Sequence, residues 1–173
     1  TNLIDAECTS ITIGAGQIPT VTAPIGNRSI VISALSSFPF TENFEGGNFN
    51  NWILENGSQL NAWKIGTATN NGGTKSAYIS NDNGVSNSYT IYPTTYVSHF
   101  YRDITFPATG EYHLSFDWKG VGESTFDYLK VFLVDVNTTP VSGTLLSSGQ
   151  IGSLYNGQTN WQTADIIFDA ANS

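Results

Sequence analysis

A chain of 173 residues with 39% hydrophobic and 13% aromatic residues is long enough to bury the core of one domain, and it is too rich in aromatic residues to be a disordered acidic tail. Its net charge of -8 repels phosphate backbones and anionic lipid surfaces, which argues against nucleic-acid partners. No stretch approaches the roughly 18 apolar residues that cross a bilayer, which argues against membrane insertion.

Two further features of the composition concern the origin of the chain. It contains no Met, so we expect a processed protein or a fragment. Removal of an export signal is the simplest processing, and it predicts an extracellular or cell-surface location. The single cysteine, Cys8, cannot form a disulfide within the chain, and we expect a half-buried small side chain there.

The first 37 residues differ in amino-acid composition from the rest of the chain. Two strand-like pieces, "SITI" at 10–13 and "RSIVISAL" at 28–35, flank a middle that contains Gly and Pro. Because Gly and Pro interrupt regular structure, residues 1–37 are interpreted as an N-terminal extension, either a linker or an edge hairpin. Aromatic residues become dense from Phe38, where the main domain, 38–173, is expected to begin.

Short strands separated by turns are predicted along most of the main domain. Clusters such as "NNGG", "NDNG" and "PATG" mark the turns, because Asn and Gly tolerate positive φ. No helical period of useful length appears. The pattern predicts an all-β fold, a β-sandwich of two antiparallel sheets. The strands are expected at 51–54, 61–66, 76–80, 88–92, 96–106, 111–118, 126–136, 144–150 and 161–168.

Two of these strands indicate how they are buried. In "EYHLSFDW" apolar and polar residues alternate, which predicts one buried face and one solvent face. Tyr112 and Trp118 belong to the buried face, whereas His113 and Asp117 belong to the solvent face. In "FDYLKVFLVDV" both faces are apolar, which predicts a central strand covered on two sides, with Asp127 at its mouth.

The motifs of common catalytic sites are missing from the sequence. Neither His99 nor His113 has Cys, His or Glu at zinc-ligand spacing, and there is no G-x-S-x-G elbow and no Gly-rich phosphate loop. One carboxylate pair suits catalysis on a glycosidic bond, namely Glu123 with Asp117 or Asp127. Because carboxylates on a Gly-flanked turn are usually solvated, a noncatalytic protein is the preferred interpretation.

Calcium suits the acids of this chain better, because a hard cation takes carboxylate, amide and backbone oxygens in flexible geometry. The stretch "NDNG", residues 81–84, is rich in such groups and directly follows an expected strand. It is too short for an EF-hand loop, and by itself it predicts only a turn.

An ordered series of segments carries a resemblance to a known family. The segments are "PFTENFEGGNFNNWILEN", "AWKIG", "KSAYISNDNG" and "YRDITFPATGEYHLSFDWKGVGESTFDYLKVFLV". From about Phe38 to Asp169 the sequence resembles the MAM-like jelly-roll modules of secreted bacterial surface proteins, a group that includes cleaved-adhesin domains and choice-of-anchor modules. The resemblance implies a jelly-roll β-sandwich that acts as a noncatalytic adhesion or structural module, with surface glycans or proteins as partners.

The resemblance also implies a calcium site. In such families the Phe-Glu near the domain start supplies a calcium carboxylate, here Glu45, and the acid after the "YIS" strand corresponds to Asp82. The Gly-Glu and Asp-x-Leu-x-Val elements add Glu123 and Asp127 as further candidates. The Ca2+ ion would join loops that are distant in sequence, because it removes the repulsion between their carboxylates.

The end of the sequence departs from the family pattern. These modules normally close with a further pair of strands that ends in an Ala-Ile-Asp-Asn-Ile-like segment, whereas this sequence stops at "IIFDAANS". A sheet without its last strand exposes an unpaired edge. The resulting hypothesis is strand complementation, in which "RSIVISAL" or "SITI" of one copy pairs with the open edge of another and builds a filament.

The aromatic residues leave one more alternative open, a carbohydrate-binding module accessory to a secreted enzyme. The four tryptophans fall in strand-like runs and are expected to pack in the core. A sugar-stacking platform would instead use the tyrosines in or near polar turns: Tyr89, Tyr92, Tyr96 and Tyr155.

Overall fold

The computed structural model of the chain describes residues 6–15, 38–46, 51–91, 96–123 and 125–171. This part of the chain is all-β, with ten strands and no helix, and its paired strands are antiparallel. The predicted all-β, antiparallel fold is therefore confirmed. Within the same residues, no helix is long and apolar enough to cross a membrane.

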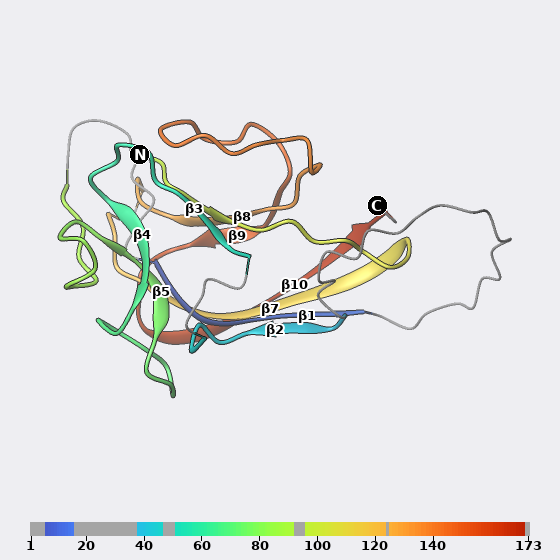
Figure 1. The fold of residues 1–173 in the computed structure, drawn as a ribbon, viewed down its shortest axis with the longest axis horizontal. Helices are drawn as coiled ribbons and strands as arrows, with labels where there is room; N and C mark the ends of the chain where they lie inside the picture. Colours follow the sequence, from blue (N-terminus) through green and yellow to red (C-terminus); the bar gives the residue numbers. More distant parts are fainter. Residues whose placement is uncertain (1–5, 16–37, 47–50, 92–95, 124, 172–173) are drawn as a thin grey trace, which may run out of the picture.

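A six-stranded main sheet forms one layer of the molecule, and β1, β2, β7 and β10 run along the bottom of Figure 1. The strand order is β10-β7-β1-β5-β4, and β2 pairs with part of β1. The strands of this sheet are β1 (Ala6–Ala15), β2 (Phe40–Glu42), β4 (Ala62–Gly66), β5 (Ser76–Ser80), β7 (Gly110–Gly120) and β10 (Gln158–Ala170).

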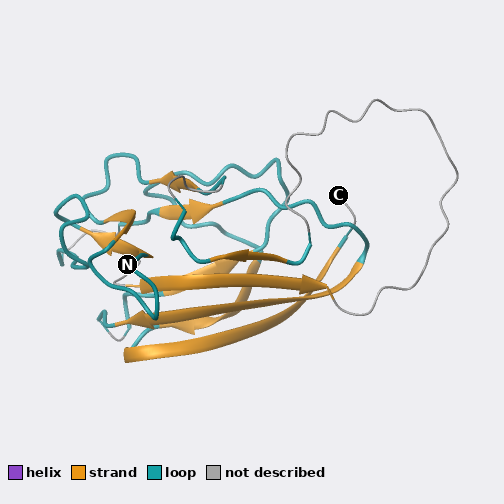
Figure 2. Cartoon of the chain, turned by 60° about the horizontal axis from the view of Figure 1, so that its bottom comes forward, coloured by secondary structure: helices purple, strands orange, loops and turns teal. Residues whose placement is uncertain are grey.

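Two short ribbons and long loops lie over one face of the main sheet, as Figure 2 shows. One ribbon pairs β3 (Ile53–Glu55) with β6 (His99–Tyr101), and the other pairs β8 (Leu129–Phe132) with β9 (Gln150–Tyr155). The described strands thus form one large sheet and two small ones, and the expected sandwich of two sheets stays a prediction. The jelly-roll connectivity that the resemblance implies stays a prediction.

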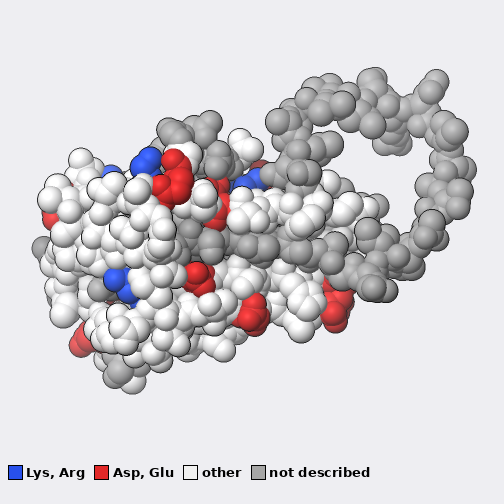
Figure 3. Space-filling model, turned by 90° about the horizontal axis from the view of Figure 1, so that it is seen from below, with Lys and Arg blue, Asp and Glu red and all other residues white. Residues whose placement is uncertain are grey.

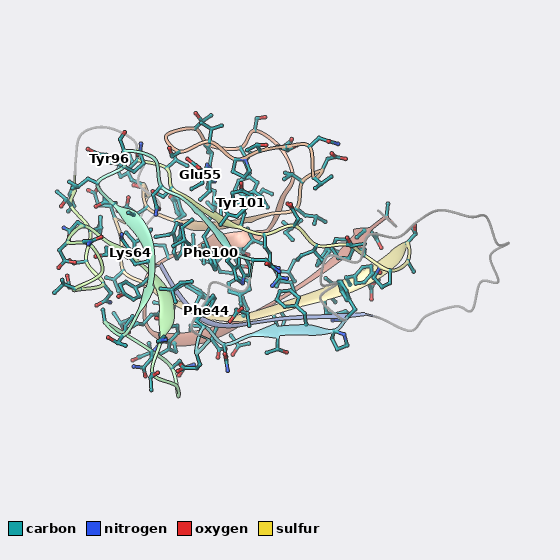
Figure 4. All side chains as sticks on the ribbon, viewed as in Figure 1. Phe44, Glu55, Lys64, Tyr96, Phe100 and Tyr101 are labelled. Atoms are coloured by element: carbon teal, nitrogen blue, oxygen red, sulfur yellow. The ribbon has the colours of Figure 1, made fainter. Side chains whose placement is uncertain are left out.

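The hydrophobic core lies between the main sheet and the ribbons and follows from the alternation in β7. Phe116 and Trp118 are buried in the main cluster, Leu114 packs against it, and Tyr112 is buried in a second cluster with Phe106 and Ala170. The predicted buried face is therefore confirmed. The ribbons supply the other side of the core, since Phe100 of β6 lies 5.7 Å from Phe44 between ring centroids (Figure 4). The main cluster consists of Phe40, Phe44, Trp63, Ala77, Ile79, Phe116, Trp118, Tyr155, Ala164 and Ile166.

Several strands differ from their predicted positions. The expected central strand 126–136 is the short strand β8, which pairs only with β9 among the described residues and is partly exposed. An apolar run does not reveal how many hydrogen-bonded neighbours a strand has, and all four residues of β8 are only partly buried. Residues 88–91, expected as a strand, form a loop. The Ser88 carbonyl accepts a hydrogen bond from the Asn81 amide (2.9 Å) and so closes a turn. The strand expected at 144–150 begins only at Gln150.

The N-terminal segment takes part in the main sheet. Residues 6–15, which include "SITI" and Cys8, form β1 and pair with β7, β5 and β2. The expected boundary at Phe38 therefore does not separate this segment from the sheet. The second strand-like piece, "RSIVISAL", lies outside the described residues.

Candidate functional site

Glu45 follows β2 and links it to the turn before β5. Its Oε1 accepts hydrogen bonds from the backbone amides of Thr74 (2.7 Å) and Lys75 (2.8 Å), and its Oε2 accepts one from the Thr74 hydroxyl. These bonds, with the Thr74 hydroxyl as the largest contribution, lower the pKa of Glu45 below its ordinary value. Gly73 permits this contact, because a Cβ there would overlap the Glu45 carboxylate. We call Glu45, Thr74 and Lys75 the Glu45 clamp.

Asp82 organises the turn that follows β5. Its Oδ1 accepts hydrogen bonds from the Ser80 hydroxyl (2.7 Å) and the Ser86 amide (2.9 Å), and its Oδ2 accepts one from the Ser86 hydroxyl (2.6 Å). The hydroxyls of Ser80 and then Ser86 lower the pKa of Asp82 to about 2. Asn83 adopts a φ of 64°, which Asn tolerates better than most residues. The turn predicted from "NDNG" is therefore confirmed, and we call it the Asp82 turn.

Asp127 is buried at 2% exposure and closes the turn between β7 and β8. Its Oδ2 accepts a hydrogen bond from the Glu123 amide (2.8 Å), while the Glu123 carbonyl accepts from the amides of Phe126 and Asp127 (both 3.0 Å). Asn156, between β9 and β10, accepts from the Gly122 amide (2.8 Å) and donates to the Glu123 carbonyl (3.2 Å). We call this arrangement the Asp127 turn. In it Glu123 contributes its backbone, and the residue is exposed.

The four predicted metal ligands thus belong to three separate loops. Within the part of the chain that the structure describes, no group of three or more His, Cys, Asp or Glu side chains that could hold a metal ion is found. The face in Figure 3 likewise shows acidic side chains at several separate places. The calcium prediction gains no support from this arrangement and stays a prediction.

Two of the acids considered for glycoside chemistry, Asp117 and Asp127, accept hydrogen bonds from other parts of the chain. Asp117 lies on the outer face of β7, where its Oδ1 accepts from the Thr163 hydroxyl (2.7 Å) and its Oδ2 accepts from the Asn71 side chain (3.1 Å). Asp127 is buried in its turn and accepts the Glu123 amide. Asp117 therefore joins β7 to β10, and Asp127 orders a turn.

The two histidines occupy contrasting places. His113 lies on the outer face of β7, as predicted, and its Nε2 is 3.5 Å from the Glu111 carboxylate. His99 is buried, and its Nε2 lies 3.1 Å from the Val141 carbonyl and 2.9 Å from the Thr144 carbonyl. His99 therefore attaches the loop after β8 to β6.

Glu42 is buried and Arg102 is partly buried, although no motif in the sequence marks either residue. Glu42 is 3% exposed and accepts a 2.7 Å hydrogen bond from the Phe44 amide. The Arg102 guanidinium lies 4.1 Å from the ring centroid of Phe40 and 5.5 Å from that of Trp52. Burial lowers the pKa of Arg102, and the Glu42 carboxylate acts against this shift. The signal available in the sequence was the alternation of "FTE", which places Glu42 on the face of Phe40.

The tyrosines proposed for sugar stacking do not form one exposed set. Tyr155 is buried, with its ring 5.2 Å from Phe116 and 5.1 Å from Trp118 between centroids. Tyr89 packs against the same core, and Tyr92 lies outside the described residues. The structure therefore assigns Tyr155 to the core rather than to a binding platform.

No protein-family model, no curated protein and no solved structure matches the chain. The resemblance to MAM-like modules therefore rests on the sequence segments alone.

Proposed function

We propose that the chain is a noncatalytic extracellular adhesion or structural module. The observation that carries the proposal is the use of its acids: Glu45, Asp82 and Asp127 each accept hydrogen bonds from their own loops. A group that already holds the backbone in place is suited to keeping loops in shape at the edge of a sheet. Such fixed loops are what a module needs in order to present a constant surface.

The glycosidase alternative has weaker support. Glycoside hydrolysis places two carboxyl groups on either side of the scissile bond, with one of them protonated to act as the acid. Here Asp127 is buried against the Glu123 backbone, and Asp117 is hydrogen-bonded to Thr163 and Asn71. Both carboxylates are therefore engaged in holding segments of this chain together.

Activity measurements test the noncatalytic assignment. The wild-type chain and Glu123→Gln are incubated with a panel of polysaccharides, and the release of reducing ends is measured. We expect both proteins to stay at the level of the buffer. Turnover by the wild type that disappears in Glu123→Gln would instead place this acid in an active site.

Calcium remains a separate part of the proposal, as a stabiliser of the loops that carry Glu45 and Asp82. Both acids are ionised at neutral pH, because their pKa values lie below the already low ordinary values of carboxyl groups, and Ca2+ binds ionised carboxylates. A bound ion would raise the melting temperature, and a chelator would reverse the change. A melting curve that responds to neither calcium nor chelator would remove calcium from the proposal.

A further inference from the structure

Strand β1 occupies the middle of the main sheet. Along one edge it pairs with β7 over Ala6–Ala15. Along the other edge it pairs with β5 at Glu7 and Cys8 and with β2 at residues 11–13. Both edges of β1 are thus occupied, and β1 is the strand that joins β7 and β10 to β5 and β4.

The connection from β1 to the next strand is long. It consists of residues 16–39, whereas tight hairpins use two to five residues. Fully extended, such a stretch spans on the order of 80 Å at about 3.3 Å per residue. A compact domain of this size has a radius of gyration of roughly 16 Å. The connection is therefore long enough for β1 to reach the sheet of a neighbouring copy.

If β1 left its position, the main sheet would be destabilised, and the position would accept only a strand of matching direction. The empty position would leave backbone donors and acceptors of β7 and β5 unpaired in the middle of the sheet. A strand that fills it must run antiparallel to both β7 and β5. Residues 6–15 of a second copy meet this condition by identity, because they make the same pairs. The closed and exchanged forms then differ only in the connection, which is the condition for domain swapping.

We infer that β1 is exchanged between copies, so that residues 6–15 of one chain complete the main sheet of another. The partner is a second copy of this chain, and the exchange rests on the structural role proposed above for the chain. Its test measures strand exchange alone. It can therefore fail while the chain remains noncatalytic, and the activity test can fail while strands exchange.

Cysteine pairing between two different chains tests the inference. Thr12 and Ser115 are register partners, and such partners have Cβ atoms about 4.5–5.5 Å apart. In a Cys8→Ser background, one chain carries Thr12→Cys and the other Ser115→Cys. The two chains are unfolded, refolded together over a range of concentrations and oxidised with glutathione disulfide. Non-reducing electrophoresis, with one chain isotopically labelled for mass spectrometry, measures the covalent heterodimer.

A matched control replaces Ser115→Cys with Ser147→Cys, in an exposed part of the loop between β8 and β9. We expect at least ten times more heterodimer from the register pair than from the control pair, increasing with protein concentration. A double variant with Thr12→Cys and Ser115→Cys in one chain reports whether β1 enters its position at all. Two results would overturn the inference. In the first, the register pair gives no more heterodimer than the control pair, and the double variant forms its disulfide only within monomers. In the second, the double variant forms no disulfide.

Discussion

The carboxylate of Glu45 accepts a 2.7 Å hydrogen bond from the backbone amide of Thr74, 29 residues away in the sequence. Two more hydrogen bonds, from the Thr74 hydroxyl and the Lys75 amide, reach the same carboxylate. The end of β2 is thereby attached to the turn that leads into β5. The residue that the resemblance nominates as a calcium ligand thus has a structural role that needs only protein partners.

Neutralising Glu45 tests whether the clamp stabilises the fold without metal. Glu45→Gln keeps the size of the side chain but removes the charge that strengthens its hydrogen bonds. We expect a lower melting temperature than that of the wild type at neutral pH in the presence of a chelator, followed by circular dichroism. Glu123→Gln is the control, because Glu123 is exposed. Equal melting temperatures for the two variants would show that the clamp contributes nothing.

Asp82 makes stability depend on pH in a defined window. Its pKa in the folded chain, about 2, lies below the ordinary value of 3.8. Its stabilising contribution is therefore complete above pH 3.8 and is lost as the pH falls toward 2. We expect Asp82→Asn to melt below the wild type at pH 7, with the difference shrinking between pH 4 and pH 2. Asp103→Asn, at an exposed position, controls for the change in net charge. A difference that does not vary with pH contradicts this assignment.

Gly122 and Gly110 form a matched pair for testing the Asp127 turn. A methyl group at Gly122 would overlap the Asp127 Cβ, whereas one at Gly110 would meet open space. Neither position has the positive φ that would add backbone strain. Gly122→Ala is expected to lower the free energy of unfolding by about 1–3 kcal/mol, as overpacking does. For Gly110→Ala we expect a change within about 0.5 kcal/mol in the same urea titration. Equal losses would mean that the turn tolerates displacement of Asp127.

The sequence predicted local features well and long-range ones poorly. The alternation in "EYHLSFDW" correctly assigned the two faces of β7, because a strand's faces depend on its own residues alone. The apolar run at 126–136 did not reveal that β8 pairs with a single strand among the described residues, because the number of neighbours depends on the rest of the fold. The central place of β1 was missed for the same reason. Its partners, β7, β5 and β2, all follow it after a long connection.

For the acids of the candidate site, too, the sequence predicted local features but not long-range ones. Acids in turns were correctly expected near strand ends, since "NDNG" forms the Asp82 turn and Asp127 immediately precedes the β8 region. Which acid is enclosed was decided by packing. In "PFTENFEGG" the buried carboxylate is Glu42, near Arg102, whereas Glu45 is bound by a turn that lies far along the chain.

Removal of the Glu42 carboxylate should therefore be costly. Glu42→Ala leaves the Phe44 amide without its acceptor and withdraws negative charge from the vicinity of Arg102. The free energy of unfolding is expected to fall by about 1–3 kcal/mol, the usual cost of an unsatisfied buried donor. Glu111→Ala, on the exposed face of β7, is the control and should change it by less than about 1 kcal/mol. A Glu42→Ala chain as stable as the control would contradict the packing described for this residue.

The central claim is that the acids of this chain hold its loops together, and a double-mutant cycle on Glu45 and Thr74 tests it most directly. Thermal unfolding is measured in chelator for the wild type, Glu45→Gln, Thr74→Val and the double variant. Because Thr74 donates its hydroxyl to Glu45, the loss in the double variant should be smaller than the sum of the two single losses. Losses that add fully would show that the two side chains act independently, which would contradict the claim that Glu45 holds this turn through the Thr74 hydroxyl.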